Sequence, residues 1–146
     1  METFTKTVGE FIDRVNLAAA GQEADPYALL DDDVRVFING TTPLSGIFRG
    51  PEQVARILVS AAKRRVASFH MELVEFVGAG PRLVVRVIVT GSTPGGTVFN
   101  EDRADLGIVF EVRDGKIVEI KAFPDTMLIE MALFGKKYVP RADRVG

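Results

Sequence analysis

The spacing of apolar residues changes near residue 67, and this change limits the possible folds more than any other feature of the sequence. Before it, Phe4, Val8, Phe11 and Val15 recur three or four residues apart, which predicts an amphipathic helix over about residues 3–19. After it, apolar and polar residues alternate, which is typical of strands with one buried face. Helices followed by strands in successive hairpins predict an α+β fold.

Two more helices are predicted before this change. Pro26 at a first helical position predicts a short helix over about residues 26–31, and the apolar face of PEQVARILVSAAKRR predicts a longer helix over residues 51–65. Between them, VRVFI predicts a strand and residues 39–50 a loop rich in Gly and Pro. A final helix, TMLIEMALFG, is predicted over residues 126–135.

The second half of the chain predicts four strands joined by hairpins, over residues 67–77, 82–91, 97–112 and 116–123. Strands this long require a strongly curled sheet, and Gly107, inside the longest, is a candidate β-bulge. We therefore expect a cone-shaped, curved antiparallel sheet wrapped around the N-terminal helices, with the C-terminal helix closing it. An apolar lining makes the open mouth of such a cone a pocket for a small molecule.

Composition argues against several kinds of site and partner. The chain has no cysteine and a single histidine, His70, so it lacks thiolate chemistry and the roughly three side-chain ligands of a His-based metal site. Its net charge of -2, without a basic stripe, argues against nucleic acid. No apolar stretch approaches the roughly 20 residues that span a bilayer. We expect one cytoplasmic domain over residues 1–146, with no membrane partner, metal or cofactor.

Three consecutive acidic residues, Asp31, Asp32 and Asp33, resemble a metal cluster. Adjacent residues on a helix point in different directions, so we interpret the run as the solvated end of the short helix.

Two segments carry a resemblance to a known family. ALLDDDVRVFINGTTPLSGIFRGPEQV (28–54) and VFEVRDGKIVEIKAFPDTMLIE (109–130) resemble the nuclear transport factor 2-like superfamily, which has a cystatin-like α+β roll, and within it the SnoaL-like polyketide cyclase branch. The resemblance extends over about residues 5–135. It implies a cone with a deep apolar cavity and a homodimer formed through the outer face of the sheet. It is specific for the fold rather than for the reaction, because this fold hosts many activities.

Comparison with steroid isomerases and SnoaL-like cyclases of the superfamily reduces the number of possible mechanisms. The resemblance places Ile38 and Ile108 where steroid isomerases carry a base carboxylate and a protonated oxyanion-hole Asp, so neither of those groups is present. SnoaL-like cyclases use an Asp after the last strand as general acid/base in an aldol ring closure, and Asp125 matches that position.

Limonene-epoxide-hydrolase relatives use a Tyr and an Asn two apart on the first strand, an Arg-x-Asp pair on a later strand and a final Asp. Here Phe37 replaces the Tyr, while Asn39 and Asp125 match the Asn and the final Asp. Arg103 and Asp105 imitate the Arg-x-Asp pair, but they lie one strand too late.

Asp125 has two interpretations. Immediately before a helix, Asp is a good N-cap that accepts backbone N–H bonds, and those bonds lower the pKa of a carboxylate. Alternatively, the carboxylate faces the cavity, where loss of solvent raises its pKa toward neutrality and makes it an effective acid/base.

Other candidate residues surround the predicted mouth. The Asn39 amide can hold a carbonyl oxygen or a water beside Asp125, or can serve the Asn-Gly turn. His70 begins a strand, and histidine is the side chain best suited to proton transfer near neutral pH. Tyr27 is expected on the short helix that rims the mouth, and Phe37 among the aromatic residues that line the cavity.

The sequence does not decide which residues of the predicted strand 97–112 face inward. Without a bulge, Asn100 and Asp102 face the cavity, whereas with one Glu101, Arg103 and Asp105 do. Arg86, on the middle strand, is expected on the outer face.

Two functions are compatible with these residues, and a third is weaker. One is a cofactor-free cyclase or isomerase that acts on a hydrophobic, carbonyl-bearing molecule through Asp125 and Asn39. The other is a non-catalytic ligand-binding or dimerisation module of the same fold. An epoxide hydrolase is the third.

Overall fold

The computed structural model describes residues 3–125 and 129–135, and it is helical at its start, as predicted. Helix α1 (Phe4–Ala19) buries Thr7, Val8 and Ile12. A short 3-10 helix, η1 (Pro26–Leu29), follows it, and the Asp25 carboxylate caps this helix by accepting a 3.0 Å hydrogen bond from the Tyr27 amide. Among the described residues, no helix is long and apolar enough to cross a bilayer.

The longer helix predicted over residues 51–65 is confirmed, but its central part is π-helical. It begins as α2 (Gly50–Gln53), widens into the π-helical segment η2 (Val54–Val59) and ends as α3 (Ser60–Lys63). Another π-helical turn, η3 (Ile129–Leu133), is the described part of the predicted final helix, whose residues 126–128 lie outside the described residues. Apolar spacing does not distinguish a π-helical segment from an α-helix, because both bury one face.

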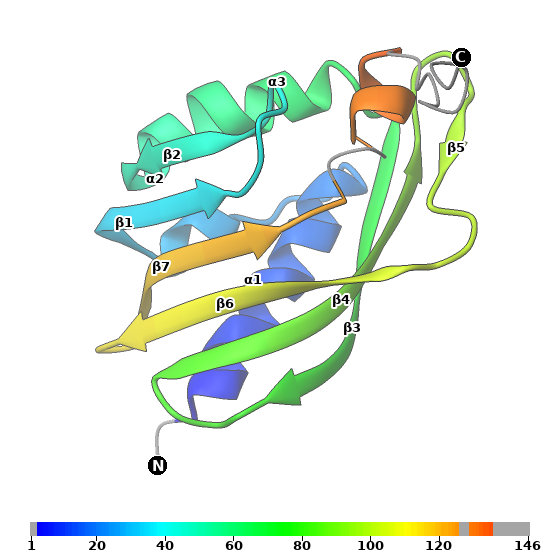
Figure 1. Cartoon of the computed structure of the whole chain (residues 1–146). Coiled ribbons are helices and arrows are strands. Elements are labelled where there is room, and N and C mark those ends of the chain that lie inside the picture. The colour runs from blue at the N-terminus through cyan, green and yellow to red at the C-terminus, as the bar shows by residue number, and fades with distance from the viewer. Residues whose placement is uncertain (1–2, 126–128, 136–146) are drawn as a thin grey trace, which may run out of the picture.

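The strands form one strongly curved sheet in the order β2-β1-β7-β6-β4-β3, with β5 paired to β4 (Figure 1). Neighbours are antiparallel except β1 and β7, which run parallel. The curved sheet packed on helices confirms the predicted α+β fold. The strands are β1 (Leu30–Ile38), β2 (Gly46–Arg49), β3 (Ser68–Val77), β4 (Arg82–Ser92), β5 (Val98–Phe99), β6 (Asp105–Arg113) and β7 (Lys116–Phe123).

Two details of the first strands differ from the prediction. Strand β1 begins at Leu30, so Asp31, Asp32 and Asp33 lie in a strand rather than at a helix end. The register with β7 shifts across this acidic run, which therefore interrupts the ladder. Strand β2 lies in the segment predicted as loop, because a strand of four residues offers too short an alternation to recognise.

The predicted strand over residues 97–112 is two strands, and the interpretation of Gly107 as a bulge was wrong. Strand β6 pairs with β4 without interruption from Asp105 to Glu111, so the ladder passes Gly107 regularly. The chain instead leaves the sheet between β5 and β6, where Asn100 and Arg103 have φ of 57° and 55°. Positive φ is tolerated by Asn better than by most residues, and it ends the extended backbone.

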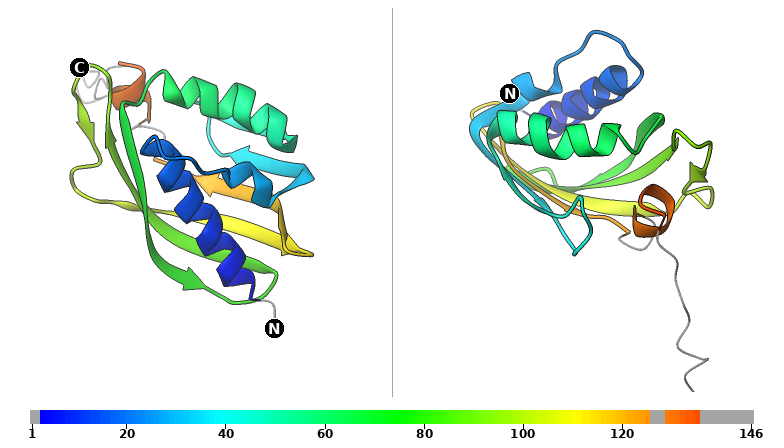
Figure 2. Two further views of the ribbon diagram at one scale, coloured as in Figure 1. Left: turned by 180° about the vertical axis from the view of Figure 1, so that it is seen from behind. Right: turned by 90° about the horizontal axis from the view of Figure 1, so that it is seen from above.

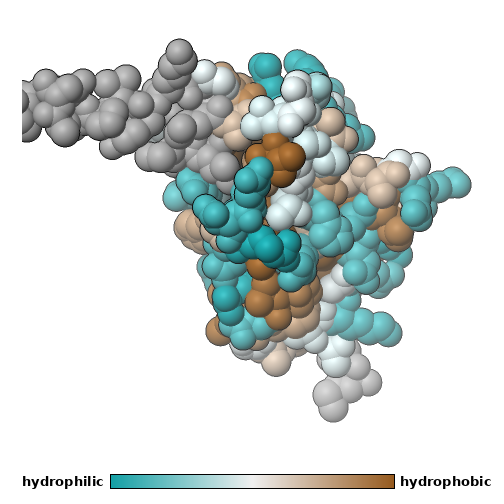
Figure 3. All heavy atoms as spheres, turned by 90° about the vertical axis from the view of Figure 1, so that its right-hand side faces the viewer, coloured by the Kyte–Doolittle hydropathy of each residue, from teal (hydrophilic) through white to brown (hydrophobic). Residues whose placement is uncertain are grey.

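The core lies between the helix-facing side of the sheet and the helices, which cover that one side (Figure 2). The rings of Phe11 on α1 and Phe110 on β6 meet edge to face, with centroids 6.0 Å apart. Seen from the side of β4 and β5, the surface is mainly hydrophilic and its apolar side chains form separate patches (Figure 3). The buried apolar side chains belong to the core between the sheet and the helices.

Asn16 ties helix α1 to the edge strand β3. Its side-chain amide donates to the Met71 carbonyl oxygen, and its side-chain oxygen accepts from the Met71 amide, both at 2.8 Å. These two bonds satisfy backbone groups that an edge strand would otherwise leave unpaired. The same contact sets the position of α1 across the inner face.

Candidate functional site

The helix-facing side of the sheet, called the inner face below, is apolar at every regularly paired position. Along each strand, alternate residues join the core, and their partners in register on neighbouring strands do the same. On β4 the inner row is Leu83, Val85, Val87 and Val89, followed by Gly91. On β6 it is Leu106, Ile108, Phe110 and Val112. At its regularly paired positions the inner face of the described sheet therefore offers no titratable side chain to a ligand.

Part of this inner face is only half-buried, and that part lies toward one end of the sheet. This open end is where β1 and β7 finish and β3 begins. The half-buried apolar side chains there, called the apolar lining below, come from five strands and from η2. They are Ile38, Leu58, Val59, Met71, Val89, Leu106 and Ala122.

Asp125 and Asn39 lie beside the lining at this same end. Strands β1 and β7 are parallel neighbours, with Ile38 opposite Ala122, so both chains leave the sheet together. The backbone N–H of Asn39 donates to the Ala122 carbonyl at 3.0 Å and extends the β1–β7 ladder by one residue. The Asp125 carbonyl accepts from the Ile129 amide at 3.1 Å at the start of η3. Both residues are exposed, and Met127 and Leu128, the predicted capping partners of Asp125, lie outside the described residues.

Two predicted binding residues, Phe37 and His70, point to the outer face of the sheet. Phe37 lies between two inner-face residues of β1, and the Lys121 ammonium is 5.1 Å from the centre of its ring. His70 pairs with Thr90 and is exposed, between the inner-face residues Phe69 and Met71. Strand alternation separates both side chains from the lining, so we do not include them in the site.

Asn100 and Asp102 lie in the turn between β5 and β6. The Asn100 amide donates to the Val89 carbonyl at 2.8 Å and to the Ala104 carbonyl at 2.9 Å, and its side-chain oxygen accepts from the Ala104 amide at 2.9 Å. Its hydrogen bonds therefore hold the turn. Asp102 is exposed at the tip.

Of the alternative set from the same segment, Glu101 is exposed in the turn, and Arg103 and Asp105 form ion pairs on the outer face. Arg103 pairs with Glu72, while Arg86 binds Asp105 through Nε and Glu75 through Nη1, each at 2.6 Å. These bonds raise the pKa of Arg86, and Arg86 lies on the outer face as predicted. Arg103 and Asp105, which resemble the Arg-x-Asp pair, are therefore separated from the apolar lining by the thickness of the sheet.

Tyr27 lies toward the opposite end of the sheet from Asp125. Helix η1 precedes β1, and the Lys116 ammonium, at the start of β7, donates to the Ala28 carbonyl at 2.5 Å. The ring of Tyr27 packs against the core, and burial, followed by the charge of Asp25, raises the pKa of its hydroxyl. The structure therefore does not bring Tyr27 together with Asn39 and Asp125.

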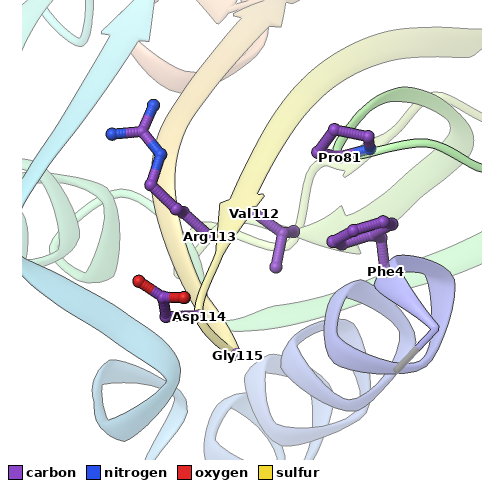
Figure 4. Close-up of a pocket in the computed structure, with 6 residues that line it drawn as sticks. All are labelled: Phe4, Pro81, Val112, Arg113, Asp114 and Gly115. Atoms are coloured by element: carbon purple, nitrogen blue, oxygen red, sulfur yellow. The ribbon is translucent and has the colours of Figure 1, made fainter. Parts of the chain in front are cut away.

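A hollow of about 490 Å³ lies between the start of α1, the β3–β4 turn and the β6–β7 turn. Phe4, Pro81 and Val112 face one another across it, whereas the Arg113 side chain points away (Figure 4). None of the predicted site residues lines this hollow. Among the described residues, no three His, Cys, Asp or Glu side chains are grouped as metal ligands.

One contact at the open end was not predicted. The Arg65 guanidinium, just after α3, lies 4.7 Å from the centre of the Phe134 ring, just after η3. The run Lys63, Arg64 and Arg65 indicated only a basic helix end that suits the helix dipole. Sequence spacing gives no sign of this pairing, because it joins segments about 70 residues apart.

The family model of the SnoaL-like domain matches residues 8–120. The chain belongs to this family. The predicted membership is thus confirmed, and with it the nuclear transport factor 2-like fold. A search of curated proteins finds no match.

Solved structures share the fold of this SnoaL-like protein over nearly its whole length. A nuclear transport factor 2-like protein of unknown function from Burkholderia pseudomallei is 21% identical, with a TM-score of 0.73, over 91% of this chain and 98% of that one. TerC, co-crystallised with polyporic acid, is 18% identical, with a TM-score of 0.72, over 90% and 98%. A candidate SnoaL-like polyketide cyclase from Jannaschia is 17% identical, with a TM-score of 0.69, over 92% and 93%. These TM-scores establish a common fold.

Proposed function

We propose that this SnoaL-like protein binds a hydrophobic, carbonyl-bearing small molecule against the apolar lining. The observation that carries the proposal is the half-buried state of seven apolar side chains on an inner face without titratable groups. Apolar surface removed from water contributes about 25 cal/mol per Å². A ligand that covers about 200 Å² gains about 5 kcal/mol, before the costs of association.

The fold neighbours support this proposal in a general way. TerC, which shares the fold, was crystallised with polyporic acid, an organic molecule. Pockets for small molecules are mostly apolar, with few polar groups that orient the ligand. The exposed Asn39 and Asp125, beside the lining, would supply those groups.

Replacing Ile38 with Asp is expected to weaken binding of phenylnaphthylamine, a neutral dye that fluoresces in apolar surroundings, at least about tenfold, or about 1.4 kcal/mol. A carboxylate in the lining must be desolvated when the dye covers it. A fluorescence titration measures the dissociation constant. Ile47→Asp is the matched control, because Ile47 on the neighbouring strand is 55% exposed and alternates to the outer face.

Equal dissociation constants for wild type and Ile38→Asp would contradict binding at the lining. The melting temperature of each variant shows whether it is folded. If Ile38→Asp does not fold, Ala122→Met offers a second variant, since it enlarges an apolar side chain and reduces the space for the dye without adding charge.

Acid/base turnover by Asp125 is a second candidate function. The observation in its favour is that Asp125 and Asn39 follow two parallel neighbouring strands and lie beside the lining. In this reaction the carboxylate takes a proton from the carbon next to the bound carbonyl group. The side-chain amide of Asn39 donates a hydrogen bond to the carbonyl oxygen of the ligand as the ligand becomes an enolate. Ring closure or isomerisation then depends on the bound molecule. An epoxide-hydrolase arrangement gains no support, because Arg103 and Asp105 lie on the outer face.

We also propose that two copies associate through the outer face of the sheet. Phe123 on β7 is 50% exposed there, the half-buried Phe37 lies on the neighbouring strand β1, and Ile47, opposite Phe37 on β2, is 55% exposed. Phe123→Asp is expected to convert dimer to monomer in light scattering after gel filtration, because it places a charge in an apolar contact. Val98→Asp, at an equally exposed valine on β5, is the control and should remain dimeric. A monomeric wild type, or a dimeric Phe123→Asp, would disprove this arrangement.

A further inference from the structure

We infer that the ligand of this site carries an anionic group and that Arg65 binds this group at the rim of the open end. The inference rests on the proposed function, since it adds a charge to the apolar ligand already proposed. It specifies the chemical class as an organic anion with an apolar body, such as an aromatic or alicyclic keto acid.

Arg65 differs in its partners from five arginines of the sheet. Arg35, Arg82, Arg86, Arg103 and Arg113 each form an ion pair with a carboxylate. Among the described residues, Arg65 has no carboxylate partner, and its contact is with the ring of Phe134. An exposed arginine held in place without a carboxylate keeps its hydrogen-bond donors available.

Stacking on Phe134 orients these donors. A guanidinium over an aromatic face keeps its N–H groups available at its edge, in a fork that matches a carboxylate or sulfonate. Phe134 is half-buried and follows η3, so its ring gives the flexible arginine a fixed support. Part of the entropy cost of ordering the side chain is therefore met before a ligand binds.

The contact lies at the end of the sheet that carries the apolar lining. The views place η3 near β5 and the adjoining end of β4, and near the C-terminal end of α3 (Figures 1 and 2). The Arg65–Phe134 contact joins these two segments. Leu58 and Val59 of the lining belong to the same helical segment that ends before Arg65. A molecule on the lining therefore meets a cation at its α3 side.

Charge at the open end also sets the orientation of such a ligand. Lys63, Arg64 and Arg65 are consecutive exposed cations without carboxylate partners in the described part of the chain. Asp125, on the β7 side, repels an anion. The anionic group consequently binds toward α3, and the carbonyl group is directed toward Asp125 and Asn39.

Two related dyes test this inference in the full-length protein. Anilinonaphthalenesulfonate carries a sulfonate on the skeleton of phenylnaphthylamine, so a comparison of the two isolates the anionic group. Arg65→Gln is expected to raise the dissociation constant of the sulfonate dye about fivefold to tenfold and to leave that of the neutral dye unchanged. Arg64→Gln is the matched control, with the same charge change at the adjacent, unstacked arginine, and is expected to change the affinity less than twofold.

The outcomes separate this inference from the proposed function. If neither dye binds, the proposed function fails and the inference fails with it. If the neutral dye binds at the lining but Arg65→Gln leaves the affinity for the sulfonate dye unchanged, the inference alone is overturned. Equal losses in Arg64→Gln and Arg65→Gln also overturn it, because they indicate general attraction to a basic surface. Selective loss in Arg65→Gln supports a built anion site.

Discussion

Gly91→Ala is expected to lower the free energy of unfolding by about 3 kcal/mol or more. Gly91 lies where β4 pairs with both β3 and β5, opposite Phe69 and Phe99. A Cβ at this position overlaps the backbone oxygen of Ser68 and lies 2.7 Å from the Phe99 ring. The backbone of β3 must therefore move away, and the pairing at the open end weakens.

Gly80→Ala provides the control for this experiment. A Cβ at Gly80 meets nothing within 4 Å, and its φ does not lie in the left-handed region, so the substitution should change stability by only a few tenths of a kcal/mol. Urea denaturation followed by circular dichroism measures both free energies. A Gly91→Ala variant as stable as Gly80→Ala would show that β3, β4 and β5 do not approach one another as closely as described.

Asp125→Asn is expected to slow proton exchange on a bound ketone at least about 100-fold, if the second candidate function is correct. Asparagine keeps the size of the side chain but cannot accept the proton. Tetralone, an apolar bicyclic ketone, is a suitable probe, because loss of its α-hydrogens in deuterated water is followed directly by NMR. The wild-type protein should accelerate this exchange over buffer.

Asp102→Asn is the matched control for Asp125→Asn. Asp102 is an exposed carboxylate at the tip of the β5–β6 turn, so its removal should leave the exchange rate unchanged. An Asp125→Asn variant that exchanges tetralone as fast as wild type, with an unchanged melting temperature, would eliminate Asp125 as the base. A wild type that binds tetralone without accelerating exchange would favour a binding module.

Helices and strands were predictable from the sequence where the pattern of apolar residues was regular over a long segment. The stripe of α1 and the alternation of β3, β4 and β7 predicted these elements to within one or two residues. The break at Asn100 did not follow, because the polar run NEDRAD (100–105), which interrupts the alternation, is also compatible with a solvated part of one strand. Positive φ at Asn100 and Arg103 ends the strand, and apolar spacing carries no information about φ.

The candidate site was predictable only in part. Asp125 follows the last strand and Asn39 the first, so the parallel pairing of β1 and β7 places both residues at the same end of the sheet. The face to which Phe37 and His70 point depends on the register of their strands. A shift of one residue moves each side chain to the other face of the sheet. The Arg65–Phe134 contact depends on how η3 and α3 lie across the open end, which is a tertiary property.

We propose that an apolar molecule binds the inner face at the open end. A crystal structure of the protein with phenylnaphthylamine bound would show where the dye lies. We expect the dye in contact with Ile38, Leu106 and Ala122, with Asp125 and Asn39 at its edge. A dye bound instead in the hollow beside Phe4 and Pro81, or on the outer face, with the apolar lining uncovered, would contradict it.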